Sequence, residues 1–218
     1  LAGAALLFSI PIFSIFSIFS IAMLAFSIAT LAVPAWAEPL AESTIIRDGS
    51  LGTDPIQETS LSGSTTFEIG ESNGDRPGGW AGINLLHSFG RFELAAEDTA
   101  NFSADYLTKN IVVRVTDPYS PTIIEGRVNT RSVQNTNRAN LYWLSPQGVI
   151  FGENAQLNVG GSLSVSTADS LSFDADGQNQ TFEARSNGAV PTLALAQPEA
   201  FGFLGHASQR LVFNSSLI

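Results

Sequence analysis

Cysteine is absent from this chain of 218 residues, and charged residues make up only 14% of it. The lack of cysteine excludes a disulfide framework. Lysine occurs once, at Lys109, and the formal net charge is −10. Nucleic acid and anionic membrane surfaces attract proteins rich in Lys and Arg. We therefore expect neither of them to be a partner of this chain.

Long helical patterns are also absent, and short polar residues are abundant instead. A helical bundle would need Glu and Lys along its outer faces, whereas Ser, Thr, Asn and Gly are plentiful here. In the later segments apolar residues alternate with polar ones, as in strands with one buried and one wet face. Strands so closely spaced leave no room for crossover helices and predict a solenoid of stacked strands. The predicted strands of this region, separated by Gly, Pro and Asn turns, are 139–144, 149–152, 156–159, 162–166 and 170–173.

Residues 1–37 carry no charge, and the run 8–33 is almost wholly apolar. The segment ends with small residues at Ala35 and Ala37, in the spacing that a signal peptidase accepts. We expect a signal peptide that is cleaved after Ala37, followed by a mature part at 38–218. The alternative is an uncleaved membrane anchor, because the apolar run exceeds the about 20 residues that span a bilayer.

A second group of motifs precedes the central strands. A strand is expected at 66–69, and a loop rich in Gly follows at 70–79. The segment 83–89 then reads Ile-Asn-Leu-Leu-His-Ser-Phe and leads to a short apolar strand at 92–94. The β-branched residues of 111–116 predict another strand. These segments extend the predicted all-β region toward the amino terminus.

Both groups resemble the amino-terminal secretion domain of the filamentous haemagglutinin family, the domain of two-partner secretion exoproteins. The resemblance covers roughly 45–218 and includes an Asn-initiated strand, a Pro-Gly turn, an Ile-Phe-Gly segment and a Gly-Gly-Ser strand. The family usually carries Asn where Ser145 and Gln147 stand, so the turn here departs from the family at two amides. The residues that we assign to the secretion signature are Asn84, His87, Ser88, Phe89, Asn140, Ser145, Pro146, Gln147, Gly148, Gly152, Gly160 and Gly161.

The resemblance implies an all-β fold, namely a right-handed parallel β-helix with an amino-terminal cap and extra-helical hairpins. With about 20–25 residues in each coil, the mature part would form about seven to nine coils, fewer if hairpins protrude. One hairpin is expected around Asp176 and Gly177, between strands at 170–173 and 180–184. No terminating cap is visible at the carboxyl end, so we expect these residues to be the front part of a longer exoprotein.

The function implied by the resemblance is secretion targeting, without enzymatic activity and without a cofactor or metal. The domain would reach the periplasm and engage an outer-membrane β-barrel transporter that has periplasmic polypeptide-transport-associated domains. It would then fold outside, as a secreted or cell-surface protein, and nucleate the stacking of later coils.

Two alternative functions remain open. A carbohydrate-active β-helix enzyme, such as a lyase or glycosidase, would need clustered carboxylates, whereas the acidic residues here are scattered through loops. An adhesin would bind glycans on a host or neighbouring cell, which is compatible with secretion. Trp80, Tyr142 and Trp143 are candidates for a sugar-stacking face. Adjacent Tyr142 and Trp143 must point to opposite faces of a strand, so we expect one of them in the core or under an extra hairpin.

Three other patterns are interpreted as structural. The Gly-x-Ser-x-Gly pattern at 70–74 lacks the following helix that a nucleophile elbow needs. His87 and His206 are the only histidines, and their spacing suggests no metal site. We expect a structural hydrogen bond at His87. The segment 174–177 resembles the start of a calcium loop but lacks the later Gly and Glu, so we interpret it as a turn.

Overall fold

The computed structural model describes most of the chain after its apolar start. The predicted signal peptide 1–37 and the alternative membrane anchor lie outside the described residues, as do His206, Asp176 and Gly177. Within the described part, no helix is long and apolar enough to cross a membrane. Its elements are β-strands and two 3₁₀ turns, η2 (Glu71–Asn73) and η3 (Gly79–Ala81). The described residues are 39–130, 138–175, 178–185, 196–204 and 209–214.

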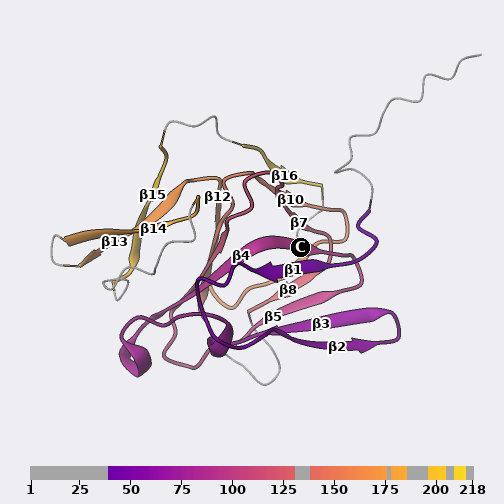
Figure 1. Cartoon of the computed structure of the whole chain (residues 1–218), viewed down its shortest axis with the longest axis horizontal. Helices are drawn as coiled ribbons and strands as arrows, with labels where there is room; N and C mark the ends of the chain where they lie inside the picture. Colours follow the sequence, from indigo (N-terminus) through magenta and orange to yellow (C-terminus); the bar gives the residue numbers. More distant parts are fainter. Residues whose placement is uncertain (1–38, 131–137, 176–177, 186–195, 205–208, 215–218) are drawn as a thin grey trace, which may run out of the picture.

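Parallel strands from successive coils lie on top of one another in three columns (Figure 1). The first column contains β4 (Asn84–Leu94), β6 (Asn110–Val115), β9 (Asn140–Leu144) and β12 (Leu163–Ser166). The second runs from the end of β4 through β7 (Thr122–Ile124) and β10 (Val149–Phe151) to β16 (Leu211–Phe213). The third contains β3 (Ser64–Ile69), β5 (Thr99–Phe102), β8 (Arg127–Asn129) and β11 (Gln156–Asn158). The predicted all-β fold, a parallel β-helix, is confirmed.

The coils are longer and fewer than expected. Leu85, Ile111, Leu141 and Leu163 share one register in the first column, so the described residues form four coils. This is fewer than the about seven to nine coils expected from typical solenoid repeats, in the direction expected if hairpins protrude. Loops such as 103–109 lengthen each coil, and three later strands leave the helix altogether.

Side chains that point into the β-helix form one continuous core. In β6, the alternate residues Ile111, Val113 and Val115 face this interior, as the period of a strand requires. The ring centres of Phe92 and Trp143 lie 4.8 Å apart in an edge-to-face arrangement, which aromatic quadrupoles favour. Because full burial of a large apolar side chain contributes about 1.5–3 kcal/mol, this core is a main source of stability.

Antiparallel strands close the amino-terminal end of the helix. β1 (Thr44–Arg47) pairs antiparallel with β4, and β2 (Gln57–Leu61) pairs antiparallel with β3. Ser62 and Gly63 reverse the chain between β2 and β3 with φ of 53° and 86°. Every residue of β2 is exposed. The antiparallel strands β1 and β2 form the predicted amino-terminal cap. They oppose the parallel stacking of another chain on this end.

A separate antiparallel sheet lies beside the β-helix (Figure 1). β13 (Ser170–Ala175) forms its centre, between β14 (Gln178–Glu183) and β15 (Pro198–Gly202). Phe173 and Phe182 from this sheet are fully buried and join a second core with Leu86 and Val112 on the outer face of the first column. The predicted extra-helical hairpin is therefore present, and it covers one face of the helix.

The pair Tyr142 and Trp143 lies as the alternation of a strand predicts. Trp143 points into the main core and is 2% exposed. Tyr142 points outward and packs against the second core, under the extra-helical sheet. The two side chains therefore do not form a common sugar-stacking face.

Candidate functional site

Two signature asparagines are joined by a third, Asn110, that lies outside the predicted signature. Asn84, Asn110 and Asn140 begin three consecutive strands of the first column and lie in register. The amide of Asn110 donates to Asn84 Oδ1 at 2.7 Å, and the amide of Asn140 donates to Asn110 Oδ1 at 3.0 Å. We call these three residues the asparagine ladder. The repeated pairing of Asn with Leu or Ile at 84–85, 110–111 and 140–141 is the signal that could have revealed it.

The asparagine ladder also forms hydrogen bonds with chain segments outside its own three strands. Asn140 Oδ1 accepts a hydrogen bond from the Ser162 backbone at 2.9 Å, which reaches the fourth coil. Asn84 donates to the Ala196 carbonyl at 2.6 Å, and Asn110 donates to Gln197 Oε1 at 2.9 Å. The ladder therefore fixes the register of four coils and the segment that leads into β15.

Signature glycines stand where a side chain would collide. A Cβ atom on Gly161 would lie 2.6 Å from Asn140 Oδ1, so glycine is needed beside the asparagine ladder. A Cβ atom on Gly152 would lie 2.8 Å from Glu125 Cγ. The neighbouring Gly160 donates its backbone N–H to Thr130 Oγ1 at 2.9 Å. These contacts place the glycine positions at points of close approach between coils.

The predicted turn at 145–148 is confirmed. Gly148 donates its backbone N–H to the Ser145 carbonyl at 2.9 Å and accepts from the Thr122 backbone at 3.0 Å. Its φ of 107° lies in a region that side chains rarely adopt. A Cβ atom there would also lie 2.8 Å from the Arg210 carbonyl. Pro146 between them is buried. The turn thus joins the first and second columns at a point where only glycine fits.

The two positions that depart from the family pattern face different surroundings. Ser145 is 1% exposed, and its hydroxyl lies 3.1 Å from the Thr122 hydroxyl. Gln147 is partly exposed and lines a shallow groove. Ser145 is therefore part of the packing between coils, whereas Gln147 lies partly exposed at the surface.

His87 does not make the structural hydrogen bond that we expected. Its ring is fully buried, with its centre 5.6 Å from the ring centre of Phe102 and 6.3 Å from that of Phe89. Within the described part of the chain, neither ring nitrogen has a hydrogen-bond partner. Burial lowers the pKa of His87 to about 4. The polar backbone of Asn73 near the ring favours the protonated form and offsets only part of this shift. At neutral pH, His87 is consequently an uncharged ring that packs against aromatic side chains in the core.

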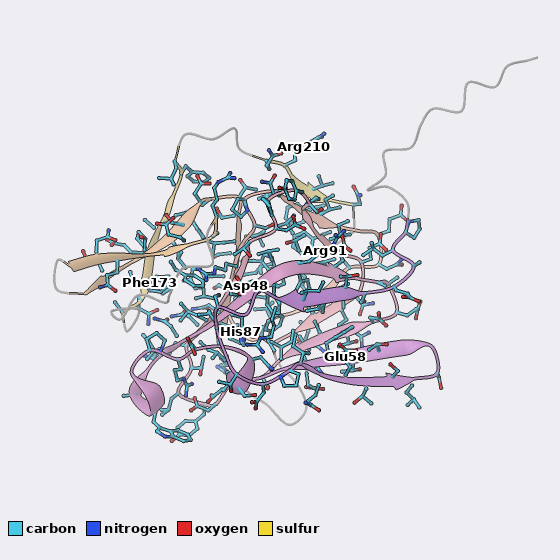
Figure 2. All side chains as sticks on the ribbon, in the orientation of Figure 1. Asp48, Glu58, His87, Arg91, Phe173 and Arg210 are labelled. Carbon is cyan, nitrogen blue, oxygen red and sulfur yellow. The ribbon has the colours of Figure 1, made fainter. Side chains whose placement is uncertain are left out.

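Ser88 belongs to a buried polar network on the opposite face of β4. Its hydroxyl donates to Asp48 and accepts from Arg114 Nε, the latter at 2.6 Å. Arg114 is fully buried and also donates to the Glu183 carbonyl at 2.6 Å and to Ser50 Oγ at 3.0 Å. Burial acts to raise the pKa of Asp48, but hydrogen bonds from Ser88 and Ser50 and the charge of Arg114 outweigh it, so this pKa lies below its usual range. Figure 2 shows Asp48 and His87 near the middle of the molecule.

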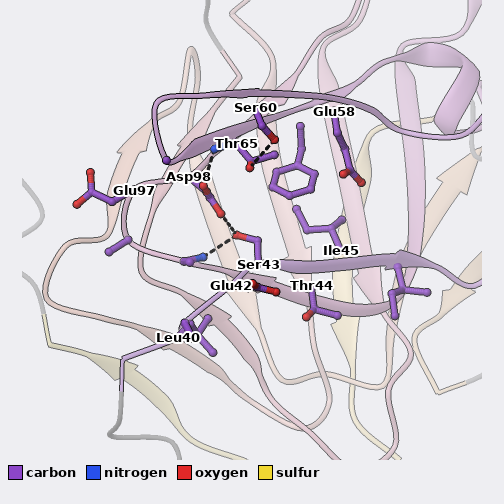
Figure 3. Close-up of a pocket in the computed structure, with 16 residues that line it drawn as sticks. Leu40, Glu42, Ser43, Thr44, Ile45, Glu58, Ser60, Thr65, Glu97 and Asp98 are labelled. Carbon is purple, nitrogen blue, oxygen red and sulfur yellow. Dashed lines mark hydrogen bonds between the residues drawn. The ribbon is translucent and has the colours of Figure 1, made fainter.

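Carboxylates gather in one hollow of about 680 Å³ between β1, the β2–β3 hairpin and the loop 95–98 (Figure 3). Asp98 accepts hydrogen bonds from the Ser43 hydroxyl and from the Thr65 backbone, so it joins the cap to the helix. No group of three or more His, Asp or Glu among the described residues is placed to hold a metal ion. The acidic residues that line the hollow are Glu42, Glu58, Glu97 and Asp98.

The Gly-x-Ser-x-Gly pattern is not a nucleophile elbow. Strand β3 precedes it, but Ser72 lies in the short 3₁₀ turn η2 and is exposed. An elbow requires a helix after the serine, and the described residues that follow form loops and the turn η3. Ser72 therefore has none of the surroundings of a catalytic serine of this type.

These features describe a capped parallel β-helix whose coils are held in register by the asparagine ladder and by glycines at points of close approach. The family model of the TPS secretion domain matches residues 43–208. The chain belongs to this family, the secretion domains of two-partner secretion, which is not an enzyme family. No curated protein and no solved structure matches the chain. It is therefore part of a secreted exoprotein, has a secretion-targeting role, and works with a partner transporter.

Proposed function

We propose that residues 38–218 are recognised in the periplasm by polypeptide-transport-associated domains of an outer-membrane β-barrel transporter. Residues 1–37 would direct export to the periplasm as a signal peptide cleaved after Ala37. The match of the TPS secretion domain to residues 43–208 is the observation that carries this proposal. The signature residues set the register and the turns of the coils, so the same positions serve both folding and export.

The proposal includes a role in starting the fold of later coils at the cell surface. Leu211 and Phe213 of β16 are 42% and 51% exposed, although they continue the inward-facing positions of the second column. Phe213 stacks on Phe151 with ring centres 4.9 Å apart and planes within 9°. A further coil would cover Leu211 and Phe213 in the same way that Phe213 covers Phe151. Because solenoids grow by nearest-neighbour stacking, this coil supports a nucleating role.

Export with and without the transporter tests the proposal. The full exoprotein should appear outside the cell only when its transporter is present, and removal of residues 43–208 should abolish export. The exported domain should resist protease, because a stacked β-helix protects its backbone. Transporter-independent export, or normal export after the removal, would contradict the proposed function.

A second candidate function, glycan binding, is favoured by two exposed aromatic side chains. Trp80 and Tyr106 are 82% and 87% exposed, and they lie on neighbouring loops. Arg76 links these loops through two bonds to the Asp105 carboxylate, at 2.6 and 2.5 Å. Aromatic rings held on fixed loops offer flat apolar faces to a ligand. Binding of the exported chain to immobilised glycans should be lost in Trp80→Ala and Tyr106→Ala if this function exists, while export stays normal.

A further inference from the structure

The tripeptide Ser-Asn-Gly occurs at 72–74 and again at 186–188. Asparagine is chemically labile in proteins, and most of all before glycine. The backbone nitrogen of the glycine attacks the side-chain amide carbon of the asparagine, ammonia leaves, and a cyclic succinimide forms. Water then opens the ring to aspartate or isoaspartate. Glycine favours this reaction because it has no Cβ to hinder the attack. The second copy lies outside the described residues, whereas the first copy is in the turn η2 and the glycine that follows it.

Folding encloses the reacting atoms of the first copy. Asn73 is 4% exposed. A Cβ atom on Gly52 would lie 2.4 Å from the Asn73 carbonyl carbon and 2.7 Å from the Gly74 nitrogen, so the backbone of Gly52 lies directly against this peptide. A Cβ atom on Gly74 would lie 2.4 Å from the Leu86 carbonyl oxygen. The attacking nitrogen also donates to the Glu71 carbonyl at 3.2 Å.

The side-chain amide of Asn73 is held by hydrogen bonds as well. Its oxygen accepts from the Gly70 backbone at 2.7 Å, and its nitrogen donates to the carbonyls of Asp54 and Pro55 at 3.0 and 3.1 Å. These bonds join the loop before β4 to the amino-terminal cap. Closure of a succinimide would break them, so the folded chain must open locally before it can react.

The fold nevertheless needs both members of this labile pair. Aspartate at position 73 has no N–H donor and would place a buried carboxylate against the carbonyls of Asp54 and Pro55. Isoaspartate would add a carbon atom to the backbone where Gly52 packs against it. Any other residue at position 74 would collide with the Leu86 carbonyl. Either product of the reaction is therefore incompatible with the contacts of the cap.

We propose that the peptide between Asn73 and Gly74 is a deamidation site that is reactive while the chain is unfolded and is closed by folding. A chain that reacts before it folds loses the contacts of the amino-terminal cap. The reaction therefore limits the time that the chain can spend unfolded during export. This time limit rests on the export order of the proposed function, whereas the dependence of the reaction on folding does not.

The secreted exoprotein, purified and kept at mildly alkaline pH either folded or in guanidinium chloride, tests the proposal. Peptide mass spectrometry follows the conversion of Asn73 and Asn187. In denaturant both should react at similar rates, because both stand in the tripeptide Ser-Asn-Gly. In the folded chain Asn73 should react at least about tenfold more slowly than in denaturant, since the reaction requires local opening. Equal rates of Asn73 with and without denaturant, or an inert Asn73 in denaturant while Asn187 reacts, would overturn the proposal.

The consequence for folding is measured with one product of the reaction. Asn73→Asp should lower the ratio of folded to unfolded chain at a fixed denaturant concentration by about tenfold or more, because a buried acceptor replaces a donor. Ser72→Asp is the matched control, since it adds the same charge at the neighbouring exposed position. Pulse proteolysis of the secreted exoprotein measures both ratios. Equal ratios in the two variants would show that deamidation does not block the cap.

A partly reacted wild-type chain gives a second measurement that needs no secreted variant. After removal of the denaturant, the protease-resistant fraction should be depleted of chains modified at Asn73. The same share of modified Asn73 in the resistant and sensitive fractions would overturn the time limit. Transporter-independent export would overturn the proposed function, but it would leave the protection of Asn73 by folding in place.

Discussion

The guanidinium carbon of Arg114 lies 4.2 Å from the ring centre of Phe182, across the boundary between the β-helix and the extra-helical sheet. Arg114 belongs to the first column and Phe182 to β14, so this contact and the bond to the Glu183 carbonyl attach the sheet to the helix. A buried cation over an aromatic face contributes about 2 kcal/mol when it is desolvated. The extra-helical sheet is therefore attached to the β-helix by the charged side chain of Arg114 as well as by apolar packing.

Replacement of Arg114 by Leu should destabilise the protein by about 3–5 kcal/mol, because Asp48 and the Glu183 carbonyl lose their buried partner. Arg114→Lys should have an intermediate effect, since it keeps the charge but loses the planar donors. Urea unfolding followed by tryptophan fluorescence measures these differences. Arg127→Leu, at an exposed position, should change stability by less than about 0.5 kcal/mol. An equal loss in both leucine variants would refute the role of the buried network.

Loss of the middle member of the asparagine ladder should cost about 2–4 kcal/mol in Asn110→Ala. Three hydrogen bonds disappear, those with Asn84, Asn140 and Gln197, and the fully buried Asn84 loses the donor that Asn110 supplies. Chemical denaturation measures the change. Asn101 offers a matched control, because it forms a similar ladder with Glu68 and Asn129 on the outside of the third column.

Asn101→Ala should cost less than about 1 kcal/mol, since water can replace the lost partners there. Similar losses at Asn101 and Asn110 would show that burial adds nothing to the inner ladder.

Gly148→Val should impair both folding and export. The valine would have to adopt a φ of 107° and bring its Cβ within 2.8 Å of the Arg210 carbonyl. Backbone strain alone contributes about 1–2 kcal/mol, and the collision adds to it. Gly49→Ala is the control, because Gly49 has a φ of 78° but a Cβ added there would meet no atom within 4 Å.

Protease resistance of the exported chain and the amount exported should both fall in Gly148→Val and fall much less in Gly49→Ala, which carries backbone strain without the collision. Poor folding with normal export would separate the turn from recognition by the transporter.

Acid should destabilise the domain through His87. Its pKa in the folded chain is about 4 and its ordinary value is 6.5, so between these values the unfolded chain binds more protons than the folded chain. Stability should therefore fall as the pH drops from 6.5 to 4, by up to about 3 kcal/mol, and level off below. Unfolding curves measured at several pH values give the free energy of unfolding as a function of pH. This free energy should change less with pH in His87→Leu than in the wild type. An unchanged slope in that variant would assign the pH dependence to other groups.

The sequence predicted the strands well because their signals are local. Alternation at 157–173 and the β-branched run at 111–116 correctly indicated strands, and the Pro-Gly turn was placed at the right residues. The opposite faces of Tyr142 and Trp143 followed from the two-residue period alone.

The remaining features depend on contacts between distant residues. The bond of Asn110 to Asn84 requires knowledge of which residues share a register, and loop lengths rather than periodicity set that register. For the same reason the number of coils was overestimated. The buried His87 was expected to bond because most buried polar groups do, and nothing local shows that the ring is surrounded by Phe89 and Phe102.

The long strand β4 has a consequence for the order in which the emerging polypeptide can become ordered. It pairs with β1 from earlier in the chain and with both β6 and β7 from later in it. If the amino terminus leaves the transporter first, the first half of β4 gains its downstream neighbour when Val115 has passed, and the end of β4 gains one only when Ile124 has passed. A stretch that ends before Asn110 would have no later strand to pair with β4, whereas one that extends beyond Ile124 would pair with β4 along its whole length and oppose backward movement.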